Sequence, residues 1–185
     1  MATETILSIF LGLGLAASAG FRVFLPLFAL SLASHFNIIP LNESWLWVGG
    51  MPALITLGIA MIAEISAYYI PFIDNVLDII ATPLAAIAGT AAMASTLIHL
   101  DPMLTWGLAI IAGGGTATVM QGMTSATRLA SSVKTAGIGN PVVSTAETGT
   151  ALTLSSLAIF LPIIALVVVV FIFVVVFWLY RKFRK

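Results

Sequence analysis

The chain contains no cysteine and few charged residues, and each shortage excludes whole classes of protein. Without cysteine there are no disulfides, thiolate metal sites or cysteine-linked lipid anchors. Charged residues make up 8% of the chain, whereas a soluble domain carries about 25% because its surface must be hydrated. Seven basic residues balance seven acidic ones, which leaves no broad basic face for nucleic acid.

Apolar side chains are abundant instead, at 61% of 185 residues, with a mean hydropathy of +1.16. Most of the surface must therefore face lipid. The N-terminus lacks the basic residues of a signal peptide and the first apolar run continues past Ala19 to Ser34, so we interpret it as a retained transmembrane helix. We predict one all-α domain over residues 1–185, a polytopic transmembrane helix bundle with broken or kinked helices.

About six spans are predicted from the apolar segments. These segments cover residues 6–34, 45–69, 84–98, 103–132 and 142–180, the last being divided at Pro162. As one helix, residues 142–180 would be about 60 Å long, roughly twice the hydrocarbon thickness. A single kinked helix or a re-entrant hairpin stays open as an alternative for this stretch. Between the second and third segments, Asp74 and Asp78 fall on one helical face and predict a solvated, interfacial connector ending at Pro83.

The order of features suggests an internal repeat. Residues 1–100 contain a span with Arg22, a span with Glu64 and a third span, and residues 101–185 repeat this order with Arg128 and Glu147. An odd number of spans per half turns the second half upside down. We therefore predict an inverted repeat of three plus three spans, an arrangement found in many secondary transporters.

Two arginines are predicted to lie inside the membrane. Arg22 ends the sequence SAGFR, about sixteen residues into the first apolar segment, and Arg128 ends the similar sequence SATR. A buried arginine costs from about 2.5 to more than 10 kcal/mol, so it normally meets a partner, a cavity or a ligand. An arginine can grip carboxylate or phosphate with two parallel hydrogen bonds, so an anionic ligand is favoured.

Each arginine has a binding and a structural interpretation, and both stay open. Arg128 and Glu147 lie at matching depth on either side of one loop, which predicts a structural pair. Glu64 matches Arg22 less well in depth, so we expect Arg22 to face open space within the bundle. Glu64 and Glu147 are predicted to be counter-charges or proton carriers.

Further candidates surround the arginines. Ser18, Ser125 and Gln121 are predicted as additional ligand contacts, although interhelical hydrogen bonding explains such residues equally well. Gly20 and Pro26 predict a break in the first segment. A second candidate break consists of three consecutive glycines, which predict either unwinding or very close helix packing: Gly113, Gly114 and Gly115.

The sequence also resembles a known family. The stretch AGFR (19–22), followed by Glu64, YYIP (68–71), the two aspartates of the connector and Thr82-Pro83, is similar to small bacterial membrane proteins grouped as domain of unknown function 4126. The resemblance implies a bacterial integral membrane protein and no particular activity. We expect a multi-pass protein of the inner membrane. With Lys134 and the basic C-terminal tail inside, both termini would be cytoplasmic, and the loops around Glu43 and Asp101 would lie on the other side.

The charges favour a small secondary transporter or lipid-carrier translocase that binds an anionic group at mid-membrane, with possible proton coupling. Partners would be membrane lipid, an anionic small molecule or lipid phosphate, and a second copy in a homodimer. A cation channel or a non-transporting scaffold are the alternatives. No enzyme motif, metal site or cofactor site is predicted, since the sequence shows no nucleophile with an evident base and no phosphate-binding glycine loop.

Overall fold

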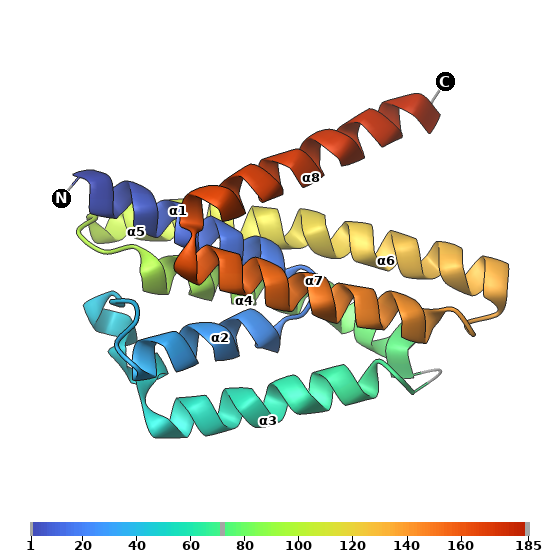
Figure 1. Cartoon of the computed structure of the whole chain (residues 1–185), viewed down its shortest axis with the longest axis horizontal. Coiled ribbons are helices and arrows are strands. Elements are labelled where there is room, and N and C mark those ends of the chain that lie inside the picture. The colour runs from blue at the N-terminus through green and yellow to red at the C-terminus, as the bar shows by residue number, and fades with distance from the viewer. Residues whose placement is uncertain (1, 71–72, 184–185) are drawn as a thin grey trace.

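The computed structural model describes residues 2–70 and 73–183, and this part of the chain is helical without strands (Figure 1). The all-α class predicted from the sequence is confirmed. The elements are α1 (Ala2–Ala19), α2 (Phe24–His35), the 3₁₀ helix η1 (Glu43–Gly49), α3 (Met51–Ala67), α4 (Ile73–Thr96), α5 (Pro102–Leu108), the π-helical η2 (Ala109–Gly114), α6 (Gly115–Thr135), α7 (Asn140–Phe160) and α8 (Pro162–Phe183).

Several helices are compatible with a membrane protein. Among the described residues, two helices are long and apolar enough to cross a bilayer, Val76–Thr96 and Pro102–Thr135. A third span results if η1 and α3, which meet at a bend of 64°, count as one. Shorter apolar helices cover Thr3–Ala19, Phe24–His35 and Pro162–Trp178. The predictions of six spans and an inverted repeat stay predictions.

The first apolar segment is a helical hairpin, which corrects the single kinked span expected from the sequence. In Figure 1, α1 runs inward from the N-terminal end, the chain turns over residues 20–23, and α2 returns toward the same end. Pro26 lies in the first turn of α2, where a proline is tolerated, so it helps to begin a helix instead of kinking one. The hairpin tip carries Gly20 and Arg22.

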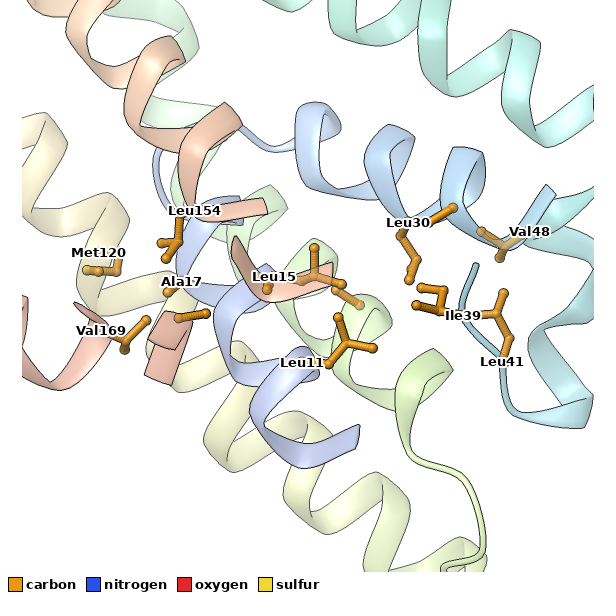
Figure 2. Packing of buried hydrophobic residues seen from close by; sticks show 14 residues of the cluster. Leu11, Leu15, Ala17, Leu30, Ile39, Leu41, Val48, Met120, Leu154 and Val169 are labelled. Carbon is orange, nitrogen blue, oxygen red and sulfur yellow. The ribbon is translucent and has the colours of Figure 1, made fainter. Parts of the chain in front are cut away.

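Helix α1 forms the centre of the bundle, with α2, α4, α6, α7 and α8 around it. Its last turns consist of small residues that are fully buried, such as Ala16 and Ala17. Figure 2 shows Leu11 and Leu15 of this helix within the main apolar cluster, between Leu30 of α2 and side chains of α6, α7 and α8. This small-residue core lets neighbouring helices approach α1 closely.

Helix α4 continues through Pro83, so the predicted break between a connector and a third span is wrong. A proline inside a helix removes one backbone hydrogen bond, yet α4 stays helical through Pro83 and packs on α1 and α6. Gly113 and Gly114 pack closely on α4, and the chain there widens from an α-helix to a π-helix without a break. A Cβ on Gly113 would lie 2.6 Å from the carbonyl oxygen of Gly89 in α4, so the two backbones touch.

The chain divides at Pro162, as predicted, because α7 ends at Phe160 and α8 begins at Pro162. In Figure 1, α8 folds back from the end of α7 and runs away from the N-terminal end. Glu4 near the start of α1 and His99 in the α4–α5 turn line one cavity, so these segments share an end of the molecule. This differs from the predicted topology, which placed the N-terminus opposite that turn.

Candidate functional site: a buried charge cluster at the hairpin tip

The tip of the α1–α2 hairpin inserts Arg22 among charged side chains from α3, α4, α6 and α7. Helix α1 ends at Ala19 and α2 begins at Phe24, so Arg22 lies in a break whose backbone is not helical. Gly20 allows the break to contact α6, since a Cβ there would lie 2.6 Å from the carbonyl oxygen of Ala117 and would also collide with Met120. The close approach buries the arginine almost completely, with 1% of its surface exposed.

Arg22 binds to one face of α7. Its Nε donates to Thr148 Oγ1 at 2.9 Å, and its Nη2 donates to the Ser144 carbonyl oxygen at 2.9 Å and to Ser144 Oγ at 2.6 Å. Its Nη1 lies 3.5 Å from Glu147 Oε2 and has no hydrogen-bond partner among the described residues. The expectation that Arg22 faces open space is therefore wrong for this conformation, because residues of α7 occupy its donors.

Arg128 and Glu147 form the ion pair predicted from their depth. Arg128 Nε donates to Glu147 Oε1 at 3.1 Å, and Nη2 contacts Glu147 Oε2. Glu147 thus lies within ion-pair range of both arginines through the same oxygen atom. Like that of Arg22, the Nη1 of Arg128 has no hydrogen-bond partner within the described part of the chain.

Tyr68, at the end of α3, covers both guanidinium groups. The Cζ atom of Arg22 lies 4.2 Å from the centre of the Tyr68 ring, and that of Arg128 lies 3.9 Å from it. A cation at this distance from an aromatic face is attracted by about 2 kcal/mol where water is excluded. The ring therefore stabilises two like charges that would otherwise repel each other across a short distance.

Glu64 binds the backbone of the hairpin tip instead of pairing directly with Arg22. Its Oε1 accepts the amide of Val23 at 2.7 Å and its Oε2 accepts the amide of Phe24 at 2.9 Å. These amides begin α2, where unpaired N–H groups and the helix dipole favour an anion. Glu64 of α3 therefore caps the N-terminus of α2.

The connector aspartates turn inward, which corrects the prediction of a solvated face. Asp78 Oδ1 lies 3.8 Å from Arg128 Nε, and the Asp78 side chain keeps 19% of its surface exposed. Asp74 is buried and accepts a hydrogen bond from Asn140 Nδ2 at 2.7 Å. The turn that was expected to lie at the interface is instead hydrogen-bonded to the start of α7.

The other predicted ligand contacts form hydrogen bonds of their own. Ser18 Oγ donates to the Ala151 carbonyl oxygen at 2.8 Å and lies 2.7 Å from Ser155 Oγ, which links α1 to α7. Gln121 Nε2 donates to Ser125 Oγ at 3.3 Å within α6. Their assignment as ligand contacts stays a prediction.

Sequence reasoning missed several members of the cluster, although two signals were present. Ser144 precedes Glu147 by one turn and Tyr68 follows Glu64 by one turn, so each shares a helical face with a predicted charge. Thr148 follows Ser144 by one turn. Asp78 was noticed but assigned to the surface. A polar residue one turn from an intramembrane charge is therefore a useful indicator of the same site.

The cluster holds more acids than bases. Three carboxylates, those of Glu64, Glu147 and Asp78, surround two guanidinium groups, so the fully ionised cluster carries net negative charge. A buried net charge is expensive, and uptake of a proton by one carboxylate would neutralise it.

The fold and the cluster together define a class: an all-helical bundle of apolar helices, compatible with a membrane protein and organised around buried charges. A scan against models of protein families matches residues 9–182 to the family described as Domain of unknown function (DUF4126), and the chain belongs to this family. The resemblance noted in the sequence is thereby confirmed. Searches of curated proteins and of solved structures found no match.

Proposed function

We propose that the protein is an integral membrane protein that works as a proton-coupled secondary transporter of a phosphate- or carboxylate-bearing substrate. One observation carries the proposal: Glu147 is shared by Arg22 and Arg128, each of which keeps an Nη1 without a hydrogen-bond acceptor among the described residues. A carboxylate of the protein thus occupies the position that an anionic substrate would take.

In the proposed mechanism, the substrate anion replaces Glu147 as the partner of the two guanidinium groups. When Glu147 accepts a proton, it no longer neutralises the two guanidinium groups, and a substrate anion binds them in its place. Release of the anion restores the pair and expels the proton. Other charged groups around this exchange are Glu64 and Asp78, and the ring of Tyr68 lies against both arginines. A helical hairpin next to such a cluster resembles the broken helices that form transporter sites at mid-membrane.

Thermal unfolding in lipid nanodiscs tests the exchange, with inorganic phosphate and succinate as probes. We expect both probes to stabilise the wild type more at the lower of two pH values than at the higher one, because the proposed exchange takes up a proton. A probe present at a hundred times its Kd stabilises by about 2.7 kcal/mol. Glu147→Gln, which imitates the protonated acid, should respond at both pH values. Arg22→Lys removes the forked donor and should respond at neither.

The proposal is contradicted if neither probe stabilises the wild type or Glu147→Gln at any pH. That result would favour a scaffold in which the arginines only join helices. The scaffold function is supported by the hydrogen bonds of Arg22, because Thr148 and Ser144 already accept from its Nε and Nη2.

A further inference from the structure

A long groove separates α3 from α4, although the two helices are consecutive in the chain. Helix α3 packs against α2 and η1, while α4 packs against α1, α6 and η2. Helix α2 therefore forms the floor between them. At 1.5 Å per residue, the 17 residues of α3 give the groove a length of about 25 Å, close to the hydrocarbon thickness of roughly 30 Å.

Two apolar cavities lie in succession along this groove. The larger, about 700 Å³, is lined by Leu27 of α2, Leu57 of α3 and the indoles of Trp45 and Trp47. The smaller, about 370 Å³, begins one turn further along, at Phe24 and Ala60. Consecutive turns of the same helices line both cavities, so one extended chain would occupy them together.

The smaller cavity adjoins the charge cluster. Tyr68 lines it, and the same ring lies against Arg22 and Arg128. Apart from Tyr68 and Glu64, the side chains that line it are apolar. The two oxygens of Glu64 accept the Val23 and Phe24 amides, so its charge is directed at the start of α2.

On the basis of the proposed function, we propose that the substrate is an anionic amphiphile, a phosphate or carboxylate on one long apolar chain. The chain lies in the groove between α3 and α4, and the head lies at Tyr68, next to the two guanidinium groups. Charge complementarity selects the head: the cationic groups Arg22 and Arg128 both lie against the Tyr68 ring, which lines this end of the groove. Length and the mainly apolar lining, in which Thr56 and Ser95 are the hydroxyl side chains, select a long apolar chain.

Tryptophan fluorescence tests where the chain lies. Trp45 and Trp47 line the end of the groove that is far from the arginines, and replacement of Trp106 and Trp178 by Phe leaves only these indoles as reporters. The probe is hexadecanoic acid brominated near its methyl end, added to nanodiscs of unbrominated lipid. We expect saturable quenching that unbrominated hexadecanoic acid reverses and acetate does not.

Two variants on α3 form a matched pair. Ala60→Phe fills the smaller cavity and should weaken the quenching by about tenfold in apparent Kd. Ile62→Phe adds a ring to the same helix at a side chain that is 62% exposed and lines neither cavity, so it should leave the quenching unchanged. Equal quenching in the two variants would overturn the groove as the site.

The same assay separates this inference from the proposed function. If hexadecanoic acid gives no saturable quenching while phosphate still stabilises the protein, the groove inference fails and the transporter proposal stands. If a brominated hexadecyltrimethylammonium binds as well as the acid, the head need not be anionic, and both proposals fail. Preference for the acid, lost in Arg22→Lys, is the result that we expect.

Discussion

Glu147 is the residue on which the charge balance of the interior depends. It meets Arg128 with both oxygens and reaches Arg22 with one of them, and the two guanidinium groups also share the ring of Tyr68. Such an arrangement concentrates two positive charges around one carboxylate. Removing that carboxylate leaves both charges without their closest acid, which costs far more than loss of a surface pair.

Glu147→Gln is therefore expected to lower the free energy of unfolding by about 3 kcal/mol. For a chain of this size, the melting temperature should fall by about 10 °C. Thermal unfolding in nanodiscs without added anion measures the change. Glu43→Gln, at an exposed position in η1, is the matched control and should change little. Equal effects of the two substitutions would show that Glu147 does not hold the cluster together.

The sequence predicted the pair of Arg128 with Glu147, but it did not predict that Arg22 would contact the same carboxylate. The Arg128–Glu147 contact followed from matching depth on two segments joined by one loop. The contact of Arg22 with the same acid depends on the hairpin, which brings residue 22 beside residues 144 and 148. The distance between these residues along the sequence does not show that the chain folds back in this way.

At the scale of elements, the α1–α2 hairpin positions the site, and two features hold its tip. Gly20 permits contact with the backbone of α6, and Glu64 caps the first amides of α2. The sequence predicted a break here from Gly20 and Pro26, but a predicted break does not give the angle between the two helices. Packing of small residues on both faces of α1 decides that angle, and composition does not report it.

A pair of glycine substitutions tests the contact at the tip. Gly20→Ala should destabilise the protein by about 1–3 kcal/mol, because its Cβ would overlap Ala117 and Met120. Gly122→Ala, in α6, has no atom within 4 Å of the new Cβ and should stabilise the helix by up to about 1 kcal/mol. Thermal unfolding of both variants measures the difference. A harmless Gly20→Ala would contradict the close contact.

Hydrogen exchange tests the cap. Glu64→Ala removes the acceptor of two amides, so the amides of Val23 and Phe24 should exchange faster and stability should fall by about 1–2 kcal/mol. Ser66→Ala, at an exposed position on the same helix, should leave the exchange unchanged. Unaltered protection in Glu64→Ala would mean that α2 does not depend on this carboxylate.

At the scale of the whole molecule, the hairpin changes the arrangement of the ends. The start of α1 and the turn at His99 line one cavity, whereas Lys134 lies at the far end of α6 (Figure 1). Charge counting predicted the N-terminus on the side of Lys134. That prediction assumed that residues 6–34 form a single span, whereas the structure folds them into the α1–α2 hairpin.

The absence of cysteine makes this arrangement easy to measure. Single cysteines at Thr3, Asp101 and Lys134 can be labelled in intact vesicles with a thiol reagent that does not cross the membrane. We expect the first two to react from one side and the third from the other. Ile62→Cys, on the apolar face of α3, should stay unlabelled. Labelling of Thr3 and Lys134 from the same side would contradict the hairpin.

Proton uptake on anion binding tests the central claim most directly. The protein in weakly buffered solution is mixed with dodecyl phosphate, and an indicator dye reports the protons removed from solution. The exchange of a carboxylate for the substrate predicts uptake of about one proton per bound anion. Glu147→Gln should bind the anion without uptake. Equal uptake by the wild type and Glu147→Gln, or an absence of binding to both, would contradict the account.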